Sequence, residues 1–370
     1  MDVHFVKKLA MNKITHKIEI SNQVEKPSIK KAFSLKTIRK GIIYFILLSL
    51  TSFTVLFFYN NTTDVLQVLK NLSPMYLLLA LGMGGLDLWI GGYRNHIFAS
   101  RYQPGISKWV CFKANLANIF LGAVTPSQSG GGPAQIYIWY RAGITLTQAF
   151  TISLVNWFST LLFFPLSALL AIYFIEDEFS GDLFPFLLKS GFSIFSTVFL
   201  VVVIAFWKPI WIGKGAKILA RFLGNLSAKW KTKLNGWGDK TYEAVQGYQV
   251  SCTEMLLQNP WLWPSSYLLT VILYFNKFCL AYVLVLGMGA TADFWTVIAI
   301  QVVLQFVLYF APSPGGSGIA EFGIAVLMAG VLTANLIPVF TLLHRIFLLF
   351  LPAVIGSFVV LRELKKHAME

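Results

Sequence analysis

The feature that most constrains this chain is a Pro/Gly-rich decapeptide that occurs twice within membrane-length apolar sequence. The first copy, PSQSGGGPAQ, covers 126–135, and the second, PSPGGSGIAE, covers 312–321, which is 186 residues later. The flanking residues keep this register, with three aligned pairs: Trp109 with Trp295, Phe120 with Phe306, and Asn115 with Gln301. An internal repeat inside a membrane protein is typical of many transporters.

The composition predicts an all-α polytopic membrane protein. Hydrophobic residues make up 56% of the chain and charged residues only 12%, whereas soluble domains carry roughly 25% charged residues. The net charge of +14 does not indicate nucleic acid as a partner, because the basic residues gather in 1–40, in 208–240 and in the tail from Arg362 onward. That distribution follows the positive-inside rule and predicts contact with anionic lipids of the inner leaflet.

Charge and apolar length together predict two membrane halves. We expect five segments: a basic cytoplasmic arm (1–40), a first membrane half (41–207) with a hairpin (109–141), a basic interfacial cytoplasmic loop (208–259), a second membrane half (260–361) with a hairpin (295–333), and a cytoplasmic tail (362–370). Trp109 follows a base, Lys108, whereas Trp295 follows an acid, Asp293. Because the flanking charges have opposite signs, we expect the two hairpins to start on opposite sides of the membrane, which predicts an inverted repeat. We expect both termini to be cytoplasmic in a bacterial or archaeal plasma membrane.

The two motifs predict broken or re-entrant helical hairpins, because each apolar arm has only about fifteen residues where a crossing needs about 20. A half-helix that starts at a glycine cluster points free N–H groups and a positive dipole end inward, which suits an anion such as phosphate. Candidate headgroup-binding residues in the first hairpin are Asn115, Pro126, Ser127, Gly130, Gly131, Gly132, Gln135 and Arg141. Those in the second are Gln301, Pro312, Ser313, Gly315, Gly316 and Glu321.

Charged side chains within apolar spans are further candidates, since such residues are functional by default. Asp87 and Arg94 are two helical turns apart on one face, and Lys277 and Arg345 lie within later spans. The two cations in the later spans are the best candidates for a lipid phosphate. The alternative is that these charges only pair with one another to lower the cost of burial.

The sequence indicates no catalytic, metal or cofactor site. The three cysteines, Cys111, Cys252 and Cys279, are far apart and have no ligand-spaced companions. We expect no cofactor. The expected partners are a phospholipid or lipid-linked substrate, anionic lipids of the inner leaflet and, in a homo-oligomer, a second copy of the chain.

The motifs resemble a known family. Thr125 to Tyr137, Arg141 to Gly143, Pro312 to Glu321 and Arg345 to Gly356 resemble the membrane region of lysylphosphatidylglycerol synthase/flippase proteins. The resemblance implies movement of a lipid between leaflets. The sequence shows no aminoacyl-transferase domain after the membrane region, so the resemblance implies a stand-alone form.

The predicted function is therefore a flippase-like lipid translocase that binds a phospholipid or other anionic lipid headgroup between two broken helices. Two alternatives remain open. One is a membrane-embedded accessory enzyme that transfers an aminoacyl or glycosyl group to a lipid, and the other is a membrane scaffold.

Overall fold

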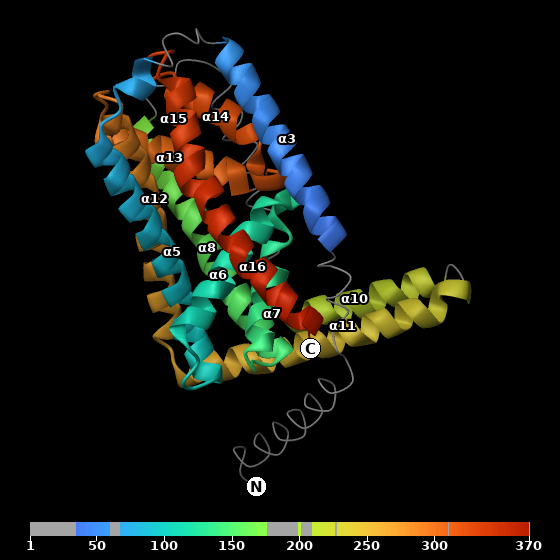
Figure 1. The fold of residues 1–370 in the computed structure, drawn as a ribbon. Helices are drawn as coiled ribbons and strands as arrows, with labels where there is room; N and C mark the ends of the chain where they lie inside the picture. Colours follow the sequence, from blue (N-terminus) through green and yellow to red (C-terminus); the bar gives the residue numbers. More distant parts are fainter. Residues whose placement is uncertain are drawn as a thin grey trace.

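The computed structural model describes residues 35–59, 67–175, 199–200, 209–225, 228–309 and 311–369, and their regular elements are all helical. The elements, labelled as in Figure 1, are α3 (Leu35–Tyr59), α5 (Pro74–Tyr102), α6 (Lys108–Ala123), η1 (Pro126–Gln128), α7 (Gly131–Arg141), α8 (Leu146–Ile175), α10 (Pro209–Asn225), α11 (Ala228–Gln258), α12 (Leu262–Gly287), α13 (Phe294–Tyr309), η2 (Pro314–Gly316), α14 (Ile319–Met328), α15 (Ile337–Arg345), the π-turn η3 (Ile346–Phe350) and α16 (Leu351–Met369). The predicted all-α fold is confirmed.

Five helical segments among the described residues are long and apolar enough to cross a membrane: Ile38–Phe58, Pro74–Tyr102, Leu146–Ala168, Leu262–Gly287 and Ile337–Glu363. The predicted polytopic membrane protein is therefore confirmed. The basic arm up to residue 34 and most of residues 176–208, which include the end of the first membrane half, lie outside the described residues.

The hairpins begin at opposite ends of the bundle. Helices α5 and α12 run antiparallel, since the Ser73 N–H donates to the Gly287 carbonyl (3.0 Å) while Arg94 reaches Thr270. Helix α6 follows the far end of α5, and α13 follows the Gly287 end of α12. The two breaks nevertheless contact each other, η1 against η2. This geometry agrees with the predicted inversion, while the inverted repeat itself stays a prediction.

The hairpin arms are short, as expected. Helices α6 and α13 have 16 residues each, and α7 and α14 have 11 and 10, so at about 1.5 Å per residue none covers 30 Å of hydrocarbon. Whether each hairpin is re-entrant in a bilayer stays a prediction.

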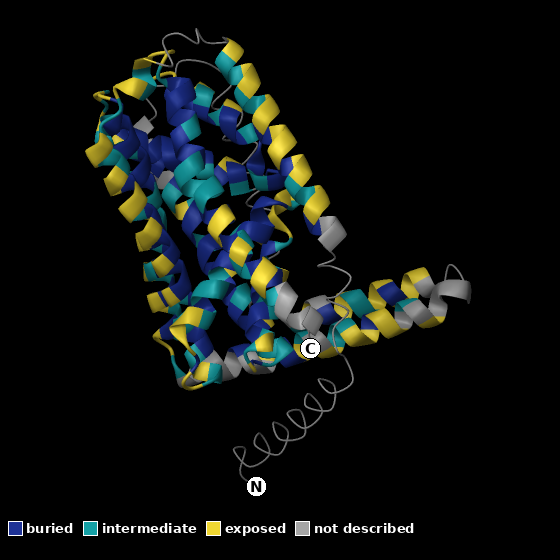
Figure 2. Cartoon of the chain, in the orientation of Figure 1, coloured by how far each residue is buried: buried dark blue, intermediate teal, exposed yellow. Residues whose placement is uncertain are grey.

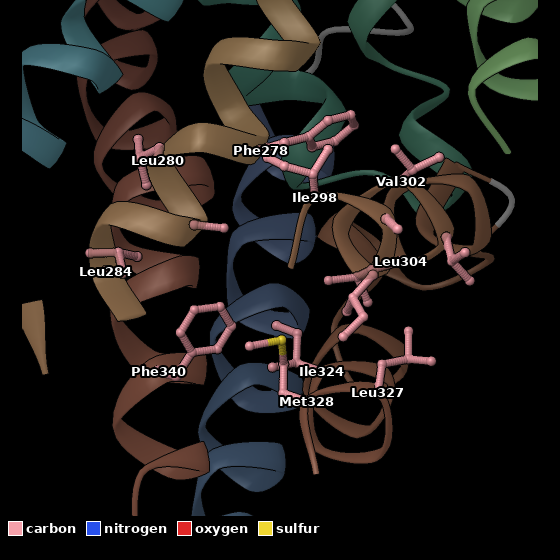
Figure 3. Close-up of a cluster of buried hydrophobic side chains, with 14 of the residues drawn as sticks. Phe278, Leu280, Leu284, Ile298, Val302, Leu304, Ile324, Leu327, Met328 and Phe340 are labelled. Carbon is pink, nitrogen blue, oxygen red and sulfur yellow. The ribbon is translucent and has the colours of Figure 1, made fainter. Parts of the chain in front are cut away.

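A large apolar cluster packs α12, α13, α14 and α15 together, and Figure 3 shows part of it. Leu280, Ile324, Met328 and Phe340 are completely buried there. Lipid tails are as apolar as these side chains, so the cluster stabilises the fold by close packing rather than by removal from water. In Figure 2 buried residues line the interior of the bundle while the exposed ones follow its outer faces.

Helices α10 and α11 form a hairpin that lies across one end of the bundle (Figure 1). Close approach requires Gly238, since a Cβ there would lie 2.8 Å from the Ala220 side chain. Lys217 Nζ lies 2.7 Å from Asp239 Oδ1 across the pair. Helix α10 exposes an apolar face, which carries Trp211, Ile218, Leu219, Phe222 and Leu223. Its position on the inner membrane surface stays a prediction.

Candidate functional site

The first break is a polar turn with left-handed backbone. Ser127 and Gln128 have φ of 51° and 54°, a conformation that costs a non-glycine residue roughly 1–2 kcal/mol. The Gly130 N–H donates to Thr125 Oγ1 (2.8 Å), which anchors the turn before α7 begins. Residues 126–129 are exposed. Polar backbone of this kind is tolerated at membrane depth only where it faces protein or water.

The second break is more enclosed and depends on glycine. Gly315, Gly316 and Gly318 have φ of 59°, 67° and 89°, which glycine alone adopts without strain. A Cβ on Gly315 would lie 2.7 Å from the ring of Phe45 and 3.2 Å from the Ala123 carbonyl oxygen. The second break is therefore fixed both by conformation and by packing against α3 and the first hairpin.

The two breaks do not follow the gap-free register of the sequence repeat. Helices α6 and α13 begin 186 residues apart, at Lys108 and Phe294, whereas η1 and η2 begin 188 residues apart, at Pro126 and Pro314. Two extra residues precede the second turn, so Pro126 corresponds in structure to Pro314 rather than Pro312. The pairing of Gln135 with Glu321 suggested by the decapeptides is lost for the same reason.

Arg345 holds the second break through three groups of contacts. Its Nε lies 3.0 Å from Glu321 Oε1, its Nη1 donates to the Gly315 carbonyl (2.9 Å), and its Nη2 donates to Ser317 Oγ (3.1 Å). Ser317 in turn lies 2.9 Å from Ser49 Oγ on α3. A buried guanidinium used in this way orders the break rather than facing an open site.

The N-terminus of α14 is already capped. Glu321 Oε2 accepts a hydrogen bond from the Gly318 N–H (2.6 Å), so the carboxylate occupies the dipole end that we expected to bind phosphate. At the start of α7, Gly131 and Gly132 carry no such carboxylate. Of the two half-helix N-termini, the first is the one that remains suited to an anionic ligand.

A second charged group lies between α5, α8 and α12. Lys277 Nζ lies 2.7 Å from Asp87 Oδ2. Arg94, which the sequence pattern placed on the same face as Asp87, instead donates from Nη1 to Thr270 Oγ1 (2.9 Å) and Thr160 Oγ1 (3.2 Å). Within the part of the chain that the structure describes, no carboxylate lies at ion-pair distance from Arg94.

This group carries an excess positive charge, because its described residues include two cations, Lys277 and Arg94, but one carboxylate, that of Asp87, which pairs with Lys277. Arg94 is half-buried, and its Nε is enclosed without a hydrogen-bond acceptor among the described residues. The hydroxyls of Thr160 and Thr270 border the guanidinium at 3.2 and 2.9 Å from Nη1. An uncompensated guanidinium bordered by hydroxyl groups is suited to a phosphate.

A chain of neutral hydrogen bonds extends the polar interior from this group to the first hairpin. Asn118 Nδ2 donates to Gln135 Oε1 (2.7 Å), and Gln135 Nε2 donates to Asn95 Oδ1 (2.9 Å). Asn95 Oδ1 also accepts from Asn156 Nδ2 (2.9 Å), while Ser266 Oγ reaches Asn156 Oδ1 at 3.4 Å. The two hydroxyls that Arg94 contacts link it to this chain, because Thr160 Oγ1 donates to the Asn156 carbonyl (3.1 Å) and Thr270 Oγ1 to the Ser266 carbonyl (2.8 Å). The charged group and the amide chain therefore form one polar column.

The remaining candidates lie outside these clusters. Asn115 donates to the Leu88 carbonyl (3.3 Å) and holds α6 against α5, while Gln301 Oε1 lies 2.9 Å from His344 Nε2 and holds α13 against α15. Arg141 is exposed at the far end of α7 from the break. Pro312 is exposed and Ser313 half-buried beside η2. The structure does not bring these five residues to one place.

Sequence reasoning missed several members of the polar column: Asn95, Asn156, Thr160, Ser266 and Thr270. A signal existed for α8, since Asn156, Ser159 and Thr160 recur at helical spacing on one face of a long apolar span. Single Ser and Thr residues in α12 carry no comparable signal, because such residues often bond only to their own helix.

Comparison with known proteins agrees with the fold. Residues 42–356 match the family model described as the lysylphosphatidylglycerol synthase TM region. The chain is also similar to a UPF0104 membrane protein of Archaeoglobus fulgidus, with 23% identity over 304 residues that cover 81% of this chain and 90% of the relative.

Proposed function

The chain belongs to the lysylphosphatidylglycerol synthase transmembrane-region family, and from this premise we propose that it is a lipid translocase of the plasma membrane. It binds the phosphate of an anionic lipid in its interior and moves the headgroup between leaflets. The observation that carries the proposal is the contact between the two helix breaks, η1 and η2, in hairpins that begin at opposite ends of the bundle.

Broken helices that meet inside a membrane protein are typical of transporter binding sites, because their freed backbone groups can bond a polar ligand. Here the exposed turn at 126–129 and the uncapped start of α7 supply such groups. The second break is fixed by Arg345 and Glu321. The proposal therefore assigns the second break to the rigid frame and the first to the ligand.

The anion-binding residue in this proposal is Arg94. The positive charges of Lys277 and Arg345 are balanced by Asp87 and Glu321, at 2.7 and 3.0 Å, and a balanced ion pair attracts a further anion weakly. The Arg94 guanidinium has no carboxylate partner among the described residues, and a lipid phosphate would provide the balancing negative charge. We therefore propose Arg94 as the residue that contacts the phosphate, whereas the sequence favoured Lys277 and Arg345.

Transbilayer movement in proteoliposomes tests the function. Purified protein is reconstituted with phosphatidylglycerol that bears a fluorophore on the headgroup, and a membrane-impermeant reductant bleaches the outer leaflet. The proposal expects continued loss of fluorescence as inner-leaflet lipid arrives outside. Bleaching that stops at the level of protein-free vesicles, with ion gradients of either sign, would refute it.

The same preparation separates the two alternatives. An accessory transferase would form a modified lipid when labelled aminoacyl or glycosyl lipid donors are added, whereas a translocase changes no covalent bond. A scaffold would show neither movement nor product, and substitution of Arg94 would leave its behaviour unchanged.

A further inference from the structure

A surface cavity lies outside the polar column, between the second half of α5 and the start of α6. It has a volume of about 230 Å³ and is lined by Trp89, Gly92, Tyr93, Lys108, Trp109 and Phe112. Trp89 and Trp109 are 57% and 59% exposed, so the groove opens at the protein surface. We call it the lateral groove. Pockets that enclose a whole small ligand measure roughly 300–1,000 Å³, so the lateral groove accommodates only part of a larger molecule.

Stacked rings build the walls of the lateral groove. The Trp89 and Tyr93 rings lie parallel with centroids 5.5 Å apart, and the Trp109 and Phe112 rings stack at 5.2 Å. Gly92 forms the floor, where a Cβ would lie 3.0 Å from the Phe112 Cα atom. These contacts hold the rings in place, and the groove is therefore preformed rather than opened by a ligand.

One cation lies at the rim. Lys108 Nζ is 6.0 Å from the centroid of the Tyr93 ring, and no carboxylate lies at ion-pair distance from it in the described ranges. Lys108 and Tyr93 are each one helical turn away from Phe112 and Trp89. The lateral groove is thus cationic beside Lys108 and aromatic one helical turn away, beside Trp89 and Phe112. A charged end next to an apolar stretch matches the headgroup and acyl chain of a phospholipid at a membrane boundary.

We propose that the lateral groove binds one anionic phospholipid of the surrounding leaflet, with its phosphate against Lys108 and an acyl chain along the four rings. This lipid is a bound partner at the protein surface and not the transported cargo, since the lateral groove is separate from Arg94 and the helix breaks. Its role is to hold the start of α6, and with it the first hairpin, at the membrane boundary.

Native mass spectrometry of the full chain released from mixed micelles tests the proposal. With equal amounts of phosphatidylglycerol and phosphatidylcholine present, the wild-type protein retains one phosphatidylglycerol in preference to phosphatidylcholine. Lys108→Gln reduces that preference at least several-fold, while Lys70→Gln, an exposed lysine elsewhere in the chain, leaves it unchanged. Trp109→Ala removes one wall and lowers retention of the lipid.

Equal retention of the two lipids by the wild type, or the same loss with Lys108→Gln and Lys70→Gln, would overturn the proposal. Because retention is measured without transport, its outcome is independent of the translocase assay. Melting temperatures of the variants in detergent show whether a loss of lipid reflects unfolding, and Trp109→Phe, which keeps an aromatic wall, restores retention if packing against the ring is what matters.

Discussion

Removing one partner of the Arg345–Glu321 ion pair is expected to destabilise the fold strongly. The two side chains are 5% and 2% exposed and their charged atoms lie 3.0 Å apart, so solvent screens the pair very little. Glu321→Gln keeps the size and an acceptor for the Gly318 N–H but leaves the Arg345 charge buried without a carboxylate. Breaking a buried pair in this way costs about 3–5 kcal/mol.

The double variant tests whether charge is the cause. Arg345→Met in the Glu321→Gln background removes both charges, at the cost of the hydrogen bonds to Gly315 and Ser317. We expect the double variant to be more stable than the sum of the single effects predicts, with a coupling free energy of about 2–3 kcal/mol.

The free energy of unfolding can be measured by titration of mixed micelles with a denaturing detergent. Glu363→Gln is the matched control, because its 2.6 Å pair with Lys113 is only partly buried, at 15% and 21% exposure. Solvent screening brings such a pair closer to the about 0–1 kcal/mol of a surface pair. A loss for Glu321→Gln no larger than that for Glu363→Gln, or additive effects in the double variant, would refute the reasoning.

Three further predictions concern the second break and the α10–α11 hairpin. Gly315→Ala adds a Cβ atom at a residue with φ of 59°, and this atom would lie 2.7 Å from the Phe45 ring. The variant is expected to lower the free energy of unfolding, measured by the same detergent titration, by more than the roughly 1–2 kcal/mol of left-handed strain alone. The hydrogen bond from Lys217 lowers the pKa of the Asp239 carboxyl below its ordinary value of 3.8. The carboxylate therefore stabilises the fold above pH 3.8, and this contribution is lost as the pH falls through the lower folded pKa. The difference in stability between wild type and Asp239→Asn is expected to shrink from pH 7 to pH 3, and a constant difference would contradict the pairing. Burial raises the pKa of the Cys252 thiol, so its reactive thiolate is scarce at pH 7.5. A maleimide is expected to label Cys252 more slowly than a cysteine placed at the exposed position of Gln246 in a protein that also carries Cys252→Ser. Equal labelling rates would contradict the burial of Cys252.

Much of the fold follows from the sequence because apolar length and charge sign act locally. Helix α5 begins at Pro74, α6 begins at Lys108 and α7 ends at Arg141, which are positions where the sequence changes in polarity in the way that lipid imposes directly. The π-turn after Arg345 has no such signal, because it depends on how α15 packs against its neighbours.

The candidate site is predictable only in part. The sequence identifies Asp87, Arg94, Lys277 and Arg345 as unusual, since charge inside an apolar span is rare. Which acid pairs with which base depends on the rotation of α5 against α12, and this places Lys277 rather than Arg94 beside Asp87. Among the charged residues of the described spans, the cation without an acidic partner is therefore Arg94 rather than Lys277 or Arg345.

The two-residue difference between the breaks is similarly invisible in the aligned motifs. Pro126 and Pro312 are aligned in the two motifs, yet the 3₁₀ turns begin at Pro126 and Pro314. Backbone φ values, rather than residue identity, set that correspondence: Ser127 and Gln128 adopt the left-handed conformation that Gly315 and Gly316 adopt in the second copy.

The most direct test of the account is the transbilayer rate of fluorescent phosphatidylglycerol with Arg94→Gln compared with Arg101→Gln, a control at an exposed arginine two turns further along α5. The account predicts that Arg94→Gln slows movement of the anionic lipid at least tenfold, while Arg101→Gln transports at the wild-type rate and both variants keep the wild-type melting temperature to within a few degrees. Equal transport rates for the two variants would contradict the claim that Arg94 binds the lipid phosphate.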